Sequence, residues 1–280
     1  MSGKLYVCAT PIGNLADVSL RLLTTLKEVD FVAAEDTRHS AKLLHHFSLH
    51  TQLISYHEHS GKAKHSQVLA ALCAGKHIAL ISDAGMPGIS DPGEELIRDA
   101  IAQGIEVTVI PGPMAGVAAL AISGLPTARF AFEGFLPRGR GERRSVLAKL
   151  EREERTLVFY EAPHRLADTL SDLLEMLGDR QAAIVRELTK VYESVERGPL
   201  SSLLTSVRKE PLRGEIVLVV SGLGLNAQAP DLDAEEVIAR LLAQGLSPAQ
   251  AARYAAQVCA LPRAELYALA VAKGAKTQKK

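Results

Sequence analysis

Three loops rich in Gly and Pro carry the residues whose types could bind a ligand and support chemistry. Residues 9–15 contain Pro11 and Gly13, residues 82–93 contain Asp83 and Asp91 among three Gly and two Pro, and residues 110–115 hold a Pro-Gly-Pro run. Such loops cost backbone entropy and add nothing to a hydrophobic core, so a binding role is favoured. None has the spacing of a dinucleotide fingerprint or of a phosphate-binding Walker loop.

Each loop also has a plainer interpretation. Residues 9–15 could form an ordinary turn at the end of a strand. Asp83 and Asp91 could both accept hydrogen bonds from the amino or hydroxyl groups of a ligand. For Asp91 the competing role is to cap a helix that Pro92 opens, because Asp favours the N-cap and Pro the first turn.

The elements that must position these loops alternate along the chain. Short runs that are apolar on both faces, such as residues 31–34 and 78–81, are typical of buried parallel strands, and helical patterns separate them. We predict an α/β fold: a first lobe over residues 1–125 with a mainly parallel sheet, a second lobe over 126–224 with a mixed sheet, and a helical appendage over 225–280. In an open parallel sheet the loops that follow the strands share one edge, where ligands bind.

Bulk properties limit the class of protein. The 280 residues include 32 Lys plus Arg and 32 Asp plus Glu, so the net charge is zero and gives no general attraction to nucleic acid. The three Cys lie far apart and match neither a disulfide framework nor a zinc site. We find no signal peptide and no apolar run long enough to span a bilayer, and we expect a cytoplasmic protein without bound metal.

Five motifs in order carry a resemblance to a known family. They lie at residues 10–15 (Thr-Pro-Ile-Gly-Asn-Leu), 34–38 (Ala-Glu-Asp-Thr-Arg), 82–87 (Ser-Asp-Ala-Gly-Met-Pro), 160–165 (Tyr-Glu-Ala-Pro-His-Arg) and 214–216 (Gly-Glu-Ile). Together with the two-lobe layout they resemble the tetrapyrrole methylases. Within that family they are most similar to the branch that methylates the ribose 2′-hydroxyl of a cytidine in 16S rRNA.

The resemblance implies a fold in which two α/β lobes bind S-adenosylmethionine between them. It also implies which residues bind this cofactor. The first loop would contribute Pro11, Ile12 and Gly13. The loops at residues 82–93 and 110–115 would contribute Asp83, Ala84, Met86, Ile89, Met114 and Ala115, and the second lobe would contribute Tyr160, Glu187, Gly214, Glu215 and Ile216. For Tyr160 the alternative is a half-buried core aromatic.

A ribose hydroxyl must lose a proton when it is methylated, so an acceptor is expected near the oxygen. The candidates for the catalytic group are Asp36, oriented by Arg38, and the pair of Glu161 with His164, with Glu35 as a further carboxylate. The alternative for Asp36 is that it caps the following helix. In the same way, the residues after Pro163 could simply open a helix.

Arginines gather in residues 138–144, and two glycines within this segment would keep it flexible. We expect these side chains to contact RNA phosphates, as Arg is suited to do. The predicted RNA-binding residues are Arg138, Arg140, Arg143, Arg144 and Arg165. A solvated helix with internal ion pairs is the alternative.

The segment from His57 to His59 could contact RNA, and a metal site there lacks a third ligand. In the appendage, two short helices with a tight break resemble a helix-turn-helix unit, which could clamp RNA or serve packing or dimerisation.

The favoured function is S-adenosylmethionine-dependent 2′-O-methylation of 16S rRNA in the small ribosomal subunit, by an enzyme that the resemblance implies is a homodimer. Two alternatives remain open. One is a C-methyltransferase of corrin or siroheme synthesis, although those enzymes show Gly-Asp-Pro where this chain has Ser82, Asp83 and Ala84. The other is a non-catalytic module that keeps the cofactor cleft and docks on the ribosome.

Overall fold

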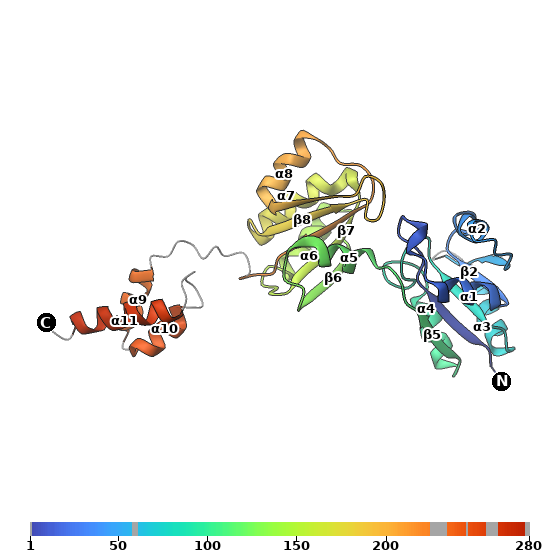
Figure 1. Cartoon of the computed structure of the whole chain (residues 1–280), viewed down its shortest axis with the longest axis horizontal. Helices are drawn as coiled ribbons and strands as arrows, with labels where there is room; N and C mark the ends of the chain where they lie inside the picture. Colours follow the sequence, from blue (N-terminus) through green and yellow to red (C-terminus); the bar gives the residue numbers. More distant parts are fainter. Residues whose placement is uncertain (1, 58–60, 225–233, 245, 256–262, 278–280) are drawn as a thin grey trace. The chain divides into compact units, whose positions relative to one another are not determined.

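The computed structural model describes residues 2–57, 61–224, 234–244, 246–255 and 263–277. They divide into a larger unit that ends at Ser221 and a smaller one that begins at Gly222 (Figure 1). The larger unit contains two five-stranded sheets, and the smaller one contains helices. The predicted α/β fold, with a parallel first sheet, a mixed second sheet and a helical appendage, is confirmed.

The first sheet has the strand order β3-β2-β4-β1-β5, and every neighbouring pair in it is parallel. Its strands are β1 (Lys4–Cys8), β2 (Phe31–Ala34), β3 (Leu53–Ser55), β4 (Ile78–Ile81) and β5 (Glu106–Ile110). The helices between them are α1 (Leu20–Glu28), α2 (Thr37–His46), α3 (Gly61–Cys73) and α4 (Glu94–Ala102), with a 3-10 turn at Leu15–Asp17.

Helices cover both faces of this sheet, which is why its central strands are apolar on both sides. Alternate β4 residues, Ile78 and Leu80, pack with α3 and α4, while Ala79 and Ile81 pack with α1 and α2. The start of α1 shows how the sequence sets such an element: Ser19 is its N-cap, and the hydroxyl accepts from the Leu22 N–H at 3.1 Å.

The second sheet has the order β6-β7-β10-β8-β9, with β6 and β7 parallel and the other pairs antiparallel. Its strands are β6 (Phe130–Phe135), β7 (Thr156–Glu161), β8 (Gln181–Arg186), β9 (Ser194–Pro199) and β10 (Ile216–Val220). The helices are α5 (Ala115–Ser123), α6 (Arg140–Lys149), α7 (Leu166–Leu177) and α8 (Leu200–Lys209), with a 3-10 turn at Pro163–Arg165.

Successive side chains of β10 point to opposite faces of the second sheet and pack into two separate hydrophobic cores. Ile216, Leu218 and Val220 pack with α6, α7 and α8, while Val217 and Val219 face α5. Helix α5, which the lobe boundary predicted at residue 125 would place in the first lobe, therefore packs on the second sheet. It carries the chain from one lobe to the other.

The smaller unit contains α9 (Ala234–Ala243), α10 (Pro248–Ala255) and α11 (Arg263–Thr277). It has its own core, in which Ile238, Ala251 and Leu266 are fully buried. Ser247 and Gln250 form a capping box before α10: the Ser247 N–H donates to the Gln250 side chain at 3.0 Å, and the Gln250 N–H points back at the Ser247 hydroxyl.

Candidate active site

The loops after β1 and β4 are held together at the carboxyl edge of the first sheet. Thr10 and Gly85 form an isolated antiparallel bridge, with N–H to carbonyl distances of 2.9 and 3.1 Å. The Thr10 hydroxyl also donates to the Ser82 carbonyl at 3.2 Å. Because β1 and β4 are neighbours in the sheet, two of the loops singled out in the sequence become a single ledge.

The loop from Asp83 to Gly93 adopts a conformation that needs its glycines. Gly88 and Gly93 have φ of 77° and 136°, and a Cβ on Gly93 would lie 2.8 Å from a methyl of Leu80. Gly93 is itself the N-cap of α4 and no side chain caps this helix. The capping role considered for Asp91 is therefore wrong, because the helix begins two residues later than Pro92 predicted.

A cavity of about 390 Å³ opens between this ledge and the second lobe. Its volume falls in the usual range of small-ligand sites, which is about 300–1,000 Å³. Ten residues predicted to bind the cofactor line it: Ile12, Ala84, Met86, Ile89, Met114, Ala115, Tyr160, Gly214, Glu215 and Ile216. The walls are mainly apolar, with Glu161, Glu215 and Asp91 as the charged residues among them.

The other four predicted cofactor residues do not line this cavity. Pro11, Gly13 and Asp83 line a neighbouring cavity of about 360 Å³ on the α2 side of the first loop. This cavity shares Ile12, Ala84 and Glu215 with the main one. Glu187 holds the backbone of the neighbouring loop: its carboxylate accepts a hydrogen bond from the Glu215 N–H at 2.8 Å. This bond also lowers the pKa of Glu187.

Tyr160 is a half-buried aromatic, as one of the two sequence interpretations has it, and it also borders the cavity. Its ring packs against Phe132 and Phe135 with centroid distances of 5.0 and 5.4 Å, and it also lines the cavity. Its hydroxyl accepts from the Gly116 N–H at 3.2 Å, in the first turn of α5. Burial is the main reason that the pKa of Tyr160 is raised, so the phenol stays neutral.

The two predicted catalytic carboxylates are placed very differently. Asp36 is the N-cap of α2, accepts from the Arg38 N–H at 2.8 Å and pairs with the Arg38 guanidinium at 2.9 Å. The bonds from Arg38 lower the pKa of Asp36 to about 2, which makes it a weak proton acceptor. The alternative that Asp36 caps the helix is confirmed, and Arg38 orients it as expected.

Glu161 lines the main cavity but is only 3% exposed. One of its oxygens accepts from the Ala162 N–H at 2.7 Å and the other from the Thr169 hydroxyl. These bonds hold the turn after β7 against α7, where Arg165 lies 3.4 Å away. His164 is exposed in that turn and is absent from the lining of this cavity.

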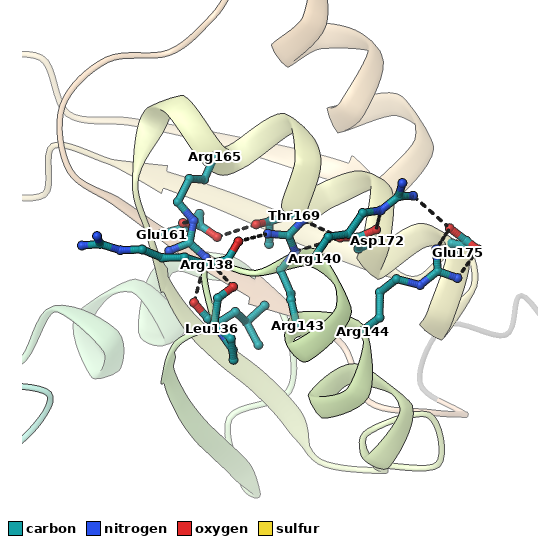
Figure 2. A network of polar contacts seen from close by, with 11 residues as sticks. Leu136, Arg138, Arg140, Arg143, Arg144, Glu161, Arg165, Thr169, Asp172 and Glu175 are labelled. Atoms are coloured by element: carbon teal, nitrogen blue, oxygen red, sulfur yellow. Dashed lines mark hydrogen bonds and ion pairs between the residues drawn. The ribbon is translucent and has the colours of Figure 1, made fainter.

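The arginine segment is a helix, which corrects the expectation of a flexible loop. Gly139 is the N-cap of α6 and Gly141 lies within it. Arg143 is 4% exposed, so the phosphate contact predicted for it is not compatible with its position. Its guanidinium donates to Asp172 of α7 at 2.8 Å, and the side chain of Asp172 is 1% exposed (Figure 2).

The other arginines around this pair are also engaged, as Figure 2 shows. Arg140 donates to Asp172 at 3.2 Å, Arg144 donates to Glu175 at 2.9 Å, and Arg165 donates to the Leu136 carbonyl at 2.7 Å. Thus α6 and α7 are joined by ion pairs between them rather than within one helix. Arg138 is exposed, and no described residue pairs with its guanidinium.

Sequence reasoning did not assign to the site several residues that the fold brings to the cavity. Phe135, Ala162 and Val217 line it from the second lobe, and Ser90 and Asp91 from the first. Burial and the nearby carboxylates of Glu35 and Asp83 raise the pKa of Asp91 to about 6. The position of Asp91 in the glycine-rich loop indicated a binding role, but the helix expected to begin at Pro92 favoured a helix-capping role instead.

Two absences concern only the part of the chain that the structure describes. No cluster of three or more His, Cys, Asp or Glu side chains within it is arranged to hold a metal ion. None of its helices is long and apolar enough to cross a membrane. In the His57 segment, Glu58 and His59 lie outside the described residues, as does Cys259.

Comparison with known proteins decides the family. The family model of the tetrapyrrole (corrin/porphyrin) methylases matches residues 4–204. The chain belongs to this family. A second model, described as the RsmI C-terminal HTH domain, matches residues 228–274 and agrees with the helix-turn-helix layout predicted for the appendage.

Two curated relatives cover nearly the whole chain. Proteins from Halalkalibacterium halodurans and Synechocystis sp., both called ribosomal RNA small subunit methyltransferase I, are 46% identical over 270 and 273 residues. These alignments cover 95% and 96% of this chain, and 93% and 98% of the relatives. The tetrapyrrole-methylase resemblance predicted from the sequence is thereby confirmed, and so is methyl transfer as the class of reaction.

Among solved structures, a Thermus thermophilus uroporphyrin-III C-methyltransferase complexed with S-adenosylhomocysteine is similar with a TM-score of 0.55. The match covers 78% of this chain and 97% of that one at 22% identity, and it establishes the shared fold. Membership of the family confirms the S-adenosylmethionine cofactor predicted from the sequence. The mainly apolar cavity, which Gly214 and Ile216 help to line, fits such a molecule.

Proposed function

We propose that the chain transfers the methyl group of S-adenosylmethionine to the ribose 2′-hydroxyl of a cytidine in 16S rRNA of the small ribosomal subunit. The observation that carries the proposal is the 46% identity, over 95% of the chain, to relatives named ribosomal RNA small subunit methyltransferase I. That similarity includes both lobes and the helical appendage. The cytidine and the 2′-oxygen come from the resemblance of the motifs.

The geometry of the cavity supports methyl transfer. A sulfonium-bound methyl group is already activated, so alignment of the acceptor oxygen with the methyl and sulfur atoms supplies much of the acceleration. Ile12, Met86 and Met114 give the cavity apolar walls that exclude water, and Tyr160 closes it from the second lobe. We assign the ten predicted cofactor residues that line this cavity to direct contact with the cofactor. The other four support the loops that form it: Pro11, Gly13, Asp83 and Glu187.

On the RNA side, we assign the phosphate contact to Arg138. It is exposed and unpaired among the described residues, whereas Arg140, Arg144 and Arg165 are engaged with Asp172, Glu175 and backbone carbonyls. We also infer that the enzyme acts as a homodimer in the cytoplasm, as the resemblance implies.

The test is methyl transfer from labelled S-adenosylmethionine to small ribosomal subunits from cells that lack this protein, followed by mapping of the modified nucleotide. Label on one cytidine 2′-oxygen is the expected result. Label that enters a tetrapyrrole precursor instead would move the chain to the corrin and siroheme C-methyltransferases. Binding of the cofactor with no transfer to any acceptor would favour the non-catalytic module.

A further inference from the structure

The cofactor cavity meets a second cavity at Ser90 and Asp91, which line both of them. The second cavity has a volume of about 750 Å³ and is lined mainly by polar side chains. Its charged lining comes from Glu35, Asp91, Glu94, Glu95 and Arg98, with His57 at the same wall. An apolar cavity that fits the methyl donor therefore adjoins a polar one, and a carboxylate lies at the junction.

The fold holds Asp91 at this junction by a backbone that few sequences adopt. Ser90 has a left-handed φ of 60°, between Gly88 and Gly93 with positive φ. The Gly88 N–H donates to the Pro92 carbonyl at 3.3 Å, which closes the loop. The Ser90 hydroxyl oxygen lies 2.9 Å from where a Cβ on Gly134 would be, so this loop closely approaches the β6 bulge, where Gly134 has a left-handed φ of 63°.

The surroundings of Asp91 suit a group that takes up a proton. It is half-buried near the carboxylates of Glu35 and Asp83, which raise its pKa, while the Ser82 side chain favours its charged form. Tyr160 lies within its electrostatic reach on the second-lobe side. Burial, ahead of these charges, raises the pKa of Asp91 to about 6, so it is ionised at neutral pH and readily protonated.

We propose that Asp91 accepts the proton of the acceptor hydroxyl, with the nucleoside held in the polar cavity and the methyl donor in the apolar one. The inference rests on the proposed function. The hydroxyl oxygen forms the new O–C bond with the methyl carbon, the C–S bond breaks with its electron pair going to sulfur, and the hydroxyl proton passes to the Asp91 carboxylate. The products are the methyl ether, the neutral thioether and protonated Asp91, which the polar cavity reconnects to solvent.

Other carboxylates near the cavity are less suited to this step. Asp36 has its pKa held near 2 by Arg38, and both oxygens of Glu161 already accept hydrogen bonds inside the protein. Glu215 pairs with Lys190 at 3.0 Å. Glu35 lines the polar cavity but not the cofactor cavity, so it does not lie at their junction.

The charge of the polar cavity also favours a nucleoside over a phosphate. Carboxylates outnumber the single guanidinium of Arg98 in its lining, so they would repel a phosphate. A carboxylate can instead accept a hydrogen bond from the exocyclic amino group of cytosine. The flanking phosphates would then stay outside the cavity.

The experiment compares Asp91→Asn with the full wild-type chain in single-turnover methylation of small subunits, from about pH 5 to about pH 9. The wild-type rate should rise with pH, with a midpoint near 6, and then level off, because only ionised Asp91 accepts the proton. In Asp91→Asn the rate should fall by about 100-fold or more and the rising limb should disappear. The affinity for S-adenosylmethionine should stay within about threefold, which a merely structural role would not predict.

Asp168→Asn is the matched control, since Asp168 is an exposed Asp on α7 that lines neither cavity, and it should leave the rate and its pH profile unchanged. Asp91→Glu should restore part of the rate together with the rising limb, and it serves as the test if Asp91→Asn does not bind the cofactor. A rate for Asp91→Asn within about threefold of wild type, or a rising limb that survives in it, would overturn the proposal. So would Asp91→Glu without that limb. Failure of the proposed function looks different, because wild type itself would then leave the subunits unlabelled.

Discussion

At the scale of single residues, the acidic groups around the site differ in what their neighbours offer them. Asp36 accepts hydrogen bonds from the side chain and the backbone N–H of Arg38, which favour its charged form and lower its pKa to about 2. Asp91 is half-buried beside two other carboxylates, which disfavour the charged form and raise its pKa to about 6. Residue type alone makes these two Asp equivalent as catalytic candidates, and their surroundings separate them.

Two substitutions of Tyr160 separate the contribution of its ring, which lines the cofactor cavity, from that of its hydroxyl. Tyr160→Phe should leave the affinity for S-adenosylmethionine within about threefold and cost about 1 kcal/mol of stability, because the Gly116 N–H loses its acceptor. Tyr160→Ala should weaken binding by about tenfold or more, since the ring forms part of the wall. Calorimetric titration with the cofactor measures both. Equal affinities for the two variants would show that the ring does not face the ligand.

Gly214 tests the backbone on the other side of the same cavity. It has φ of 89°, and a Cβ there would lie 2.4 Å from the Glu187 carboxylate that accepts from the Glu215 N–H. Gly214→Ala should therefore lower the free energy of unfolding by about 1–2 kcal/mol and also weaken cofactor binding.

The control for that variant is Gly141→Ala, because Gly141 lies within α6 and a Cβ there meets nothing within 4 Å. This change should stabilise the protein by about 0.5–1 kcal/mol and leave cofactor binding unaltered. Urea denaturation and titration distinguish the two glycines. Wild-type affinity in Gly214→Ala would contradict the position assigned to this loop.

At the scale of elements, the arginine segment shows how pairing between helices changes the role of a charge cluster. Alone, α6 is a strongly basic helix, and its sequence favours contact with phosphate. Helix α7 supplies Asp172 and Glu175 opposite it, so most of the positive charge is neutralised within the lobe (Figure 2). The cluster therefore contributes chiefly to the attachment of α6 to α7.

Arg143→Ala tests this attachment. Removal of the guanidinium leaves the carboxylate of Asp172 buried with only Arg140 nearby, and we expect a loss of about 3 kcal/mol from the free energy of unfolding. Arg144→Ala, which breaks a more exposed pair with Glu175, should cost no more than about 1 kcal/mol. Denaturant titration of the two variants supplies the comparison. Similar losses in both would mean that the Arg143 pair adds nothing beyond an exposed ion pair.

At the scale of the whole molecule, the chain has two units with separate cores. The cofactor cavity is lined entirely by residues of the larger unit, and the smaller unit packs around Ile238, Ala251 and Leu266. The larger unit, which contains the cavity, and the helical appendage thus each have the core that they need to fold. The appendage remains open to both roles considered for it, an RNA clamp or packing and dimerisation.

Truncation after Ser221 separates these roles. The shortened chain should keep the melting temperature of the larger unit and bind S-adenosylmethionine within about threefold of the full chain, because its core and cavity are intact. Methylation of small subunits should fall if the appendage clamps RNA. Sedimentation measured alongside shows whether the change also alters the oligomeric state. Full methylation by a truncated chain of altered oligomeric state would instead assign the appendage to dimerisation.

The sequence by itself determined the fold class and the family, because buried parallel strands such as residues 78–81 and glycine-rich loops after them leave local signals. Ten of the fourteen residues that the resemblance implied for cofactor binding line the cavity that the structure shows, and most of these ten lie in loops between strands and helices. Tertiary structure decided what no local signal encodes: α7 places Asp172 against Arg143, and the Ser90 loop approaches Gly134 in the other lobe. Burial and neighbouring charge set the pKa of a carboxylate, and both depend on segments that are distant in sequence, such as Glu35 and Asp91.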